Sequence, residues 1–265
     1  MHSKLTILRK YLYYLATASN GRGHGVHSPF VFDFIENVLN DKKHRDIYDD
    51  IESRRRALLK DKRFIEVEDF GAGSTVIKTN QRRIDKIAAS SLKPRKFAQL
   101  LHRMVGYYQP QSIIELGTSF GITTSYLSKA NPKVSVNTFE GAKAIASIAA
   151  SNFEQLQLSN INLHLGDFNT TFSDFVKQIQ SVDFAFIDGN HRKQPTIDYF
   201  NLLLKKHHEN SIFIFDDIHW SAEMEEAWGF IKNNDAVTLS IDLFFIGIVF
   251  FRKDFKVKQH FSIQF

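Results

Sequence analysis

The chain has 265 residues, and its 43% hydrophobic and 24% charged residues are typical of an ordinary soluble globular protein. It contains no cysteine, which excludes disulfide bonds and thiolate metal sites. The net charge of +5 is spread along the chain instead of clustered, so it favours nucleic-acid binding only weakly. The length predicts one large domain or two small ones.

Two apolar runs have some features of targeting or membrane segments. The run Tyr11–Ala16 is too short and too rich in tyrosine for a signal peptide. The run Leu243–Phe251 is only about half as long as a membrane span. We therefore predict a cytoplasmic protein that has no membrane association.

The first part of the chain has the periodicity of helices. Leucines at positions 5, 8, 12 and 15 predict an amphipathic helix, and further helices are expected at about 30–39, 41–61, 84–89 and 95–108. The charged triplet Arg54–Arg56 is interpreted as a solvated helix face. We predict a helical N-terminal region over residues 1–95 that covers the substrate or mediates oligomerisation, which leaves a homodimer open.

From residue 113 onward, short apolar strands alternate with helices. This pattern predicts a Rossmann-like, doubly wound α/β domain over residues 96–265, built on a mostly parallel sheet. Hardly any chain separates the last two strands, so they must form a hairpin and the last strand must be antiparallel. The seven expected strands are Ile113–Leu116, Val134–Phe139, Ile161–Leu165, Phe184–Ile187, Ile212–Phe215, Val237–Ile241 and Leu243–Phe251.

A glycine-rich turn follows the first of these strands. Gly117 and Gly121 let the backbone turn sharply and let a ligand approach the N–H groups of the next helix. A dinucleotide fingerprint would need glycine at positions 119 and 122, where Ser119 and Ile122 stand, so a nicotinamide cofactor is disfavoured. A similar glycine pattern at Asp69–Thr75 has no apolar helix behind it and is expected to be a loop.

Acidic residues follow the later strands. Glu140 comes 23 residues after Gly117, where a carboxylate can accept both hydroxyls of a ribose. Asp188, Asp216 and Asp217 follow the fourth and fifth strands, and converging carboxylates repel one another unless a cation or protons intervene. Their oxygen atoms suit magnesium, manganese or calcium.

The succession of these strand ends resembles a known family. The segments ELGTSFG, FEG, GDF, FIDGNH and FDDIHW are similar, as a set, to the O-methyltransferase-like group of class I S-adenosylmethionine-dependent methyltransferases. The resemblance implies that Asp167 and Phe168 hold the adenine and that Glu115 meets the amino-acid end of the cofactor. The cofactor-binding residues would then be Glu115, Gly117, Thr118, Ser119, Gly121, Glu140, Gly141, Asp167, Phe168 and Asp188.

The acidic residues of the fourth and fifth strands also resemble the metal-ligand positions of catechol-type O-methyltransferases. That family usually has Asp-Asn where this chain has Asp216-Asp217, so Asp217 would make the site more negative. Its catalytic lysine lies three residues beyond the first ligand, and here that position is His191. Without a metal, Asp188 and Asp216 would be hydrogen-bonded strand-end carboxylates, and His191 or His219 would act as the base.

These observations predict a methyltransferase that uses S-adenosylmethionine to methylate an oxygen of a small molecule, with Asp188, His191 and Asp216 as catalytic residues. A divalent cation such as Mg²⁺ on Asp188, Asp216 and Asp217 would assist. Three alternatives stay open, namely a nucleic-acid methyltransferase, an aminopropyltransferase and a non-catalytic cofactor-binding protein. Nucleic acid as the partner is disfavoured by the dispersed charge but is not excluded.

Overall fold

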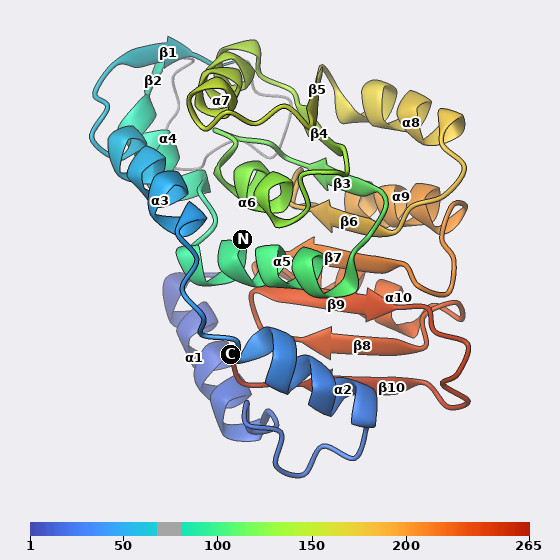
Figure 1. Cartoon of the computed structure of the whole chain (residues 1–265). Coiled ribbons are helices and arrows are strands. Elements are labelled where there is room, and N and C mark those ends of the chain that lie inside the picture. The colour runs from blue at the N-terminus through green and yellow to red at the C-terminus, as the bar shows by residue number, and fades with distance from the viewer. Residues whose placement is uncertain (68–80) are drawn as a thin grey trace. The chain divides into compact units, whose positions relative to one another are not determined.

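A computed structural model describes residues 1–67 and 81–265 (Figure 1). The expected loop at Asp69–Thr75 lies outside the described residues. The chain divides into two compact units, and each is described by itself. Unit 1 consists of residues Met1–Asp41 and Ile179–Phe265, and unit 2 consists of Lys42–Gln178. None of the helices in the described ranges has both the length and the apolar character needed to span a bilayer.

Unit 2 contains the first three strands of the predicted domain. Strands β3, β4 and β5 are parallel and adjacent in that order, while β1 and β2 form a separate antiparallel pair. The elements of unit 2 in its described residues are α3 (Ile47–Leu58), β1 (Phe64–Glu66), β2 (Gln81–Arg83), α4 (Ile84–Ser91), α5 (Arg95–Tyr108), β3 (Ile113–Leu116), α6 (Ile122–Ala130), β4 (Val136–Glu140), α7 (Lys143–Gln155), β5 (Ile161–Leu165) and α8 (Phe168–Gln178).

The helices of unit 2 bury their apolar faces as their periodicity predicts. Side chains of α3, α4 and α6, among them Ile51, Ile87 and Ile122, share one apolar cluster. The interpretation of Arg54–Arg56 as a solvated face is wrong for Arg55, which is buried and pairs with Glu52 at 3.0 Å. Burial of this pair is tolerated because the Glu52 carboxylate also accepts a hydrogen bond from the Tyr126 hydroxyl at 2.9 Å.

Unit 1 contains the remaining strands in the order β10-β8-β9-β7-β6. Strands β6 and β7 are parallel, and β9 is antiparallel to both β7 and β8, which confirms the predicted terminal hairpin. The elements are α1 (Lys4–Thr17), α2 (Pro29–Phe34), a π-helical turn η1 (Ile35–Leu39), β6 (Phe184–Ile187), α9 (Lys193–Leu204), β7 (Ile212–Asp216), α10 (Ala222–Asn233), β8 (Leu239–Asp242), β9 (Ile246–Phe250) and β10 (Gln259–Ser262).

The structure corrects the predictions at element ends. Three predicted strands begin too early, because their first residues close turns: Val134 N–H donates to Asn131 O, Val237 N–H to Asn234 O, and Phe245 N–H to Leu243 O. Residues 243–245 thus form the hairpin turn between β8 and β9. The predicted helix at 41–61 is shorter and spans Ile47–Leu58. All seven predicted strands occur, as β3 to β9, whereas β1, β2 and β10 were not predicted.

Candidate functional site

The turn between β3 and α6 has the backbone conformation that its glycines predict. Gly117 and Gly121 have φ angles of 98° and 76°, in the region that other residues rarely adopt. Gly121 also packs closely, since a Cβ atom there would lie 2.3 Å from the Phe153 ring of α7. The N–H groups of Gly117 and Thr118 both donate to Phe139 O of β4 at 3.0 Å. The turn is therefore fixed by the neighbouring strand and by α7.

Glu140 lies at the carboxyl end of β4 beside this turn. Its carboxylate accepts the N–H of Ser119 and the N–H of Ala142, each at 2.9 Å, one through each oxygen. Burial raises the pKa of Glu140, although the backbone hydrogen bonds oppose the rise. Gly141 follows at the strand end, between Glu140 and the start of α7. Each carboxylate oxygen keeps acceptor capacity for another donor, such as a ribose hydroxyl.

Glu115 of β3 is fully buried inside unit 2. Its Oε2 atom accepts hydrogen bonds from the hydroxyls of Thr124 and Thr138, and the Thr138 hydroxyl lies 2.6 Å from that of Thr118. Burial raises the pKa of Glu115 to about 7, and the two threonine hydrogen bonds only partly oppose this. Sequence reasoning selected Glu115 and Thr118 but missed Thr124 and Thr138, which come from α6 and β4.

The end of β5 meets the end of β4. The N–H of Gly166 donates to Glu140 O at 2.9 Å, and the φ angle of 133° at Gly166 turns the chain into α8. The Oδ1 atom of Asp167 accepts the N–H of Asn169 at 3.3 Å, so Asp167 caps this helix. Phe168 is the first residue of α8 and is half-buried. Unit 2 thus brings the ends of β4 and β5 together, as the strand-end positions predict.

Unit 1 gathers the acidic residues that follow β6 and β7. Asp188, His191 and Asp216 each offer one ligand atom, and these three atoms lie within 4.8 Å of one another. His191 Nε2 is 3.6 Å from Asp188 Oδ1, and His191 Nδ1 is 4.0 Å from Asp217 Oδ2. Asp217 has a left-handed backbone with a φ angle of 53°, and Asp216 is buried. The sequence predicts Asp188, Asp216 and Asp217 as the metal ligands. The set of three that the structure brings together contains His191 in place of Asp217.

The donor set suits a divalent cation. Two carboxylate oxygens and one imidazole nitrogen at these separations can share one ion, and carboxylates with imidazole are ligands for manganese, iron or zinc as well as magnesium. An imidazole nitrogen that binds a metal has no lone pair left to accept a proton. His191 is therefore either a ligand or a base through that nitrogen.

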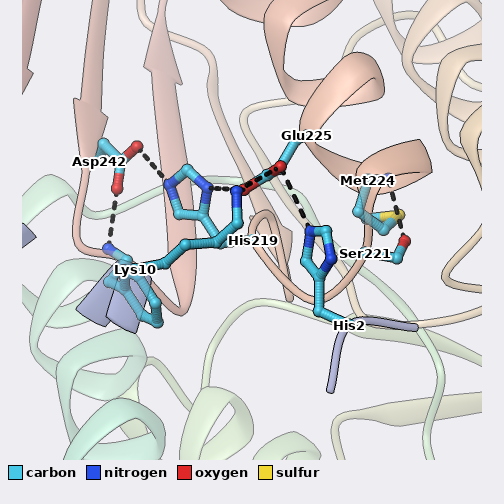
Figure 2. A network of polar contacts seen from close by, with 8 residues as sticks. His2, Lys10, His219, Ser221, Met224, Glu225 and Asp242 are labelled. Carbon is cyan, nitrogen blue, oxygen red and sulfur yellow. Dashed lines mark hydrogen bonds and ion pairs between the residues drawn. The ribbon is translucent and has the colours of Figure 1, made fainter. Parts of the chain in front are cut away.

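His219 follows β7 three residues after Asp216 and lies in a polar network (Figure 2). Its Nε2 atom is 2.9 Å from Asp242 Oδ2 and its Nδ1 atom is 3.2 Å from Glu225 Oε1. Burial lowers the pKa of His219, but the hydrogen bonds and charges of Asp242 and Glu225 outweigh this and raise it overall. Because both nitrogens face carboxylates, the protonated form of the ring is favoured, which makes His219 poorly suited to act as a general base.

A family model described as a methyltransferase domain matches residues 114–218, from β3 to the loop after β7. The chain carries a methyltransferase domain. This methyltransferase domain contains the glycine turn, Glu140, Asp167 and the set Asp188, His191 and Asp216. A search of curated proteins by sequence found no match.

Solved structures similar to this methyltransferase share its fold. The S-adenosylhomocysteine-bound methyltransferase PaMTH1 of Podospora anserina is 12% identical with a TM-score of 0.59, over 96% of this chain and 98% of that one. An O-methyltransferase from Bacillus cereus in complex with S-adenosylhomocysteine is 19% identical with a TM-score of 0.56, over 83% and 97%. TomG, an O-methyltransferase of tomaymycin synthesis from Streptomyces achromogenes in complex with S-adenosylmethionine, is 16% identical with a TM-score of 0.56, over 84% and 95%. These matches confirm the predicted fold class.

Proposed function

We propose that this methyltransferase transfers the methyl group of S-adenosylmethionine to an oxygen of a small molecule. The observation that carries the proposal is the Glu140 carboxylate, which is held beside the glycine turn by Ser119 N–H at 2.9 Å. A fixed carboxylate at a strand end, next to a helix N-terminus, matches the needs of a nucleoside-containing cofactor. Two similar solved O-methyltransferases hold S-adenosylmethionine or S-adenosylhomocysteine, which supports this cofactor and reaction.

In unit 2, the cofactor would be held by residues of three strand ends. Glu140 would accept the ribose hydroxyls, and Asp167 with Phe168 would hold the adenine. The turn Gly117–Gly121 would approach the cofactor with its backbone N–H groups. Glu115 would support the turn without direct contact with the cofactor, because the hydroxyls of Thr124 and Thr138 enclose its carboxyl group.

In unit 1, we propose that Asp188, His191 and Asp216 prepare the methyl acceptor. The acceptor hydroxyl would lose its proton to His191, its oxygen would form the new bond to the methyl carbon, and the bond from that carbon to the cofactor sulfur would break. The products are the methyl ether or ester and S-adenosylhomocysteine. Holding the reacting oxygen, carbon and sulfur in line supplies most of the acceleration expected for such a transfer.

A divalent cation fits Asp188, His191 and Asp216, with Asp217 close by. Bound there, it would lower the pKa of an acceptor hydroxyl and orient it. In that case His191 is a ligand, and the proton goes to another group or to water. The two versions of the mechanism differ in one respect that can be measured, which is the dependence of turnover on the metal.

The first experiment is isothermal titration of the protein with S-adenosylhomocysteine, with added Mg²⁺ or Mn²⁺ and then with chelator. Saturable binding supports the proposed cofactor, and no binding up to about 1 mM would overturn it. Binding that is unaffected by chelator, together with turnover of catechol-type acceptors that chelator abolishes, supports the cation. His191→Asn distinguishes the roles, since added metal restores some activity if His191 is a weakly contributing ligand but not if it is the base.

Three further assignments accompany this proposal. Residues 1–95 would cover the substrate or form an oligomer contact, and residues 96–265 would bind the cofactor, in a cytoplasmic enzyme.

Turnover of decarboxylated S-adenosylmethionine would instead indicate an aminopropyltransferase. Steeply salt-dependent RNA binding would indicate a nucleic-acid substrate. Cofactor binding without turnover of any acceptor class would indicate a binding protein.

A further inference from the structure

Helix α1 presents a row of leucines to the solvent. Leu5 is 75% exposed, Leu8 52%, Leu12 56% and Leu15 37%, and the neighbouring Met1 and Tyr13 are exposed as well. Large apolar side chains that form one continuous exposed stripe are uncommon on monomeric soluble proteins and mark an interaction surface. We name these four leucines the α1 stripe.

The orientation of α1 is fixed, so the exposure of the stripe is a property of the fold. Lys10 Nζ binds Glu225 of α10 at 2.7 and 2.9 Å, and His2 Nε2 lies 3.4 Å from the same carboxylate (Figure 2). Tyr11 packs edge-on against Phe244 with ring centroids 5.0 Å apart. The Tyr14 hydroxyl donates to Ile263 O. These contacts occupy the face of α1 opposite the stripe, so the leucines must point outward.

The spacing of the α1 stripe indicates which kind of partner covers it. Leu5, Leu8, Leu12 and Leu15 follow intervals of 3, 4 and 3, which is the a/d pattern of a coiled-coil seam. Such a seam packs against another helix that carries the same spacing. The α1 stripe of a second copy meets this requirement, because a twofold axis brings identical surfaces together.

The charges of α1 specify the direction of that pairing. The first turn has no acidic residue and the last turn no basic one, so neither end of the helix dipole is compensated within α1. Lys4 in the first turn adds a charge that is unfavourable beside its own N-terminus. In an antiparallel pair, Lys4 lies beside the C-terminal turn of the partner helix, where a cation is favourable. A parallel pair would place the two Lys4 side chains together.

We propose that the α1 stripe is a homodimer contact in which two copies of α1 pack antiparallel, with Leu5 against Leu15 and Leu8 against Leu12 of the second copy. A helix of 14 residues is about 21 Å long. Its apolar face is smaller than the roughly 800 Å² per partner of a standard stable interface. The dimer is therefore weak and forms in a concentration-dependent equilibrium. This inference is independent of the proposed reaction.

Sedimentation velocity of the full chain tests the dimer. We expect a shift from a 30.6 kDa monomer to twice that mass between about 1 μM and about 1 mM, the range of weak affinities. Leu8→Glu combined with Leu12→Glu should remove the shift and leave the circular dichroism melt unchanged, because both side chains are exposed. The matched control is Leu59→Glu with Val257→Glu, which changes two exposed apolar residues outside α1 and should dimerise like the wild type. A wild-type chain that stays monomeric throughout would overturn the proposal.

Cysteine cross-linking tests the direction, since the natural chain has no cysteine to interfere. A mixture of Leu5→Cys and Leu15→Cys chains should form a disulfide-linked dimer under mild oxidation. Leu5→Cys alone should not, because in the antiparallel pair its two copies lie about 15 Å apart, beyond the reach of a disulfide. Efficient linkage of Leu5→Cys to itself would show a parallel pair and overturn the antiparallel assignment.

Discussion

The Glu140 carboxylate accepts a hydrogen bond from the backbone N–H of Ser119, 2.9 Å away. This bond joins the carboxyl end of β4 to the glycine turn after β3, so the protein's own contacts position the two segments expected to touch the cofactor. A preformed arrangement of this kind reduces the ordering that binding would otherwise require.

Glu140→Gln should weaken S-adenosylhomocysteine binding by about 10- to 100-fold, because hydrogen bonds to a charged group contribute about 1.5–3 kcal/mol. Isothermal titration measures the affinity directly. Asp174→Asn removes a carboxylate from the exposed side of α8, where Asp174 pairs with Lys177, and is the charge-matched control. Equal affinity in Glu140→Gln and the wild type would show that Glu140 supports only the turn.

Gly121→Ala should destabilise the protein by about 2–4 kcal/mol, because the φ angle of 76° is strained for alanine and the new Cβ would lie 2.3 Å from the Phe153 ring. Urea unfolding measures the change. Gly106→Ala in α5 is the matched control, since its Cβ meets nothing within 4 Å and should stabilise the helix by about 0.5–1 kcal/mol. Trimming the ring in Gly121→Ala/Phe153→Leu should restore part of the loss, and no recovery would argue against the clash.

The His219 network should stabilise unit 1 in a pH-dependent way. The pKa of His219 is raised above 6.5, so its contribution is fully present below pH 6.5 and is lost as the pH rises through the raised value. The pKa of Glu225 is lowered below 4.5, in spite of its partial burial, by Lys10, His219 and His2. The Glu225 contribution is therefore present above pH 4.5 and is lost as the pH falls through the lowered value. Both groups contribute together between about pH 4.5 and 6.5.

His219→Gln should therefore cost more stability at about pH 6 than at about pH 9, with a difference of about 1 kcal/mol. Urea unfolding of wild type and variant at pH 6 and pH 9 gives this difference. The loss of ring packing against Phe244 does not depend on pH, so it drops out when the two stability costs are subtracted. His24→Gln in an exposed loop is the control and should show equal effects at both values. A pH-independent cost for His219→Gln would show that the ring is not held as a cation.

Glu115→Gln should stabilise the protein at high pH. The pKa of Glu115 is about 7 in the folded chain and 4.5 as the ordinary value, so the folded state binds the proton more tightly and loses stability as the pH rises from 4.5 to 7. At pH 8 the cost is about 3.5 kcal/mol, at roughly 1.4 kcal/mol for each pH unit between 4.5 and 7. The amide oxygen of glutamine can still accept from Thr124 and Thr138.

The pH dependence separates this effect from any other change that the substitution makes. The unfolding free energies of wild type and Glu115→Gln should be similar at pH 4.5 and should diverge by pH 8. Glu154→Gln changes the same residue type on the exposed side of α7 and should show no divergence. If Glu115→Gln destabilises the protein at every pH, the carboxyl is needed as a structural acceptor and its protonation is not the cause.

Residue patterns predicted the strand ends well because one rule governs them. Parallel strands bring their carboxyl ends to the same edge, so the proximity of Glu140 to the glycine turn and of Asp188 to Asp216 followed from their positions after apolar runs. The role of His191 in the acidic set was only partly foreseen. Asp217 has a left-handed backbone, and nothing in the two adjacent aspartates signals that.

Other features depend on contacts that no local pattern contains. β10 has the sequence Gln-His-Phe-Ser and pairs with β8 through its backbone, so it lacks the apolar run of the other strands. The threonines that enclose Glu115 lie 9 and 23 residues away. In α1 the leucine stripe and the opposite face with Tyr11 and Tyr14 are both apolar. The periodicity predicted the helix but could not determine which face would be buried.

Unit 1 is made from the two ends of the chain, and this has a consequence for synthesis. Tyr14 of α1 binds Ile263 O, a residue 249 positions later. A ribosome adding about 5–20 residues per second needs about 12–50 s to cover that distance. For most of this time α1 is without its docking surface, and both of its apolar faces are uncovered. Helix α1 is thus made long before the segment that it packs against, and it reaches its place late.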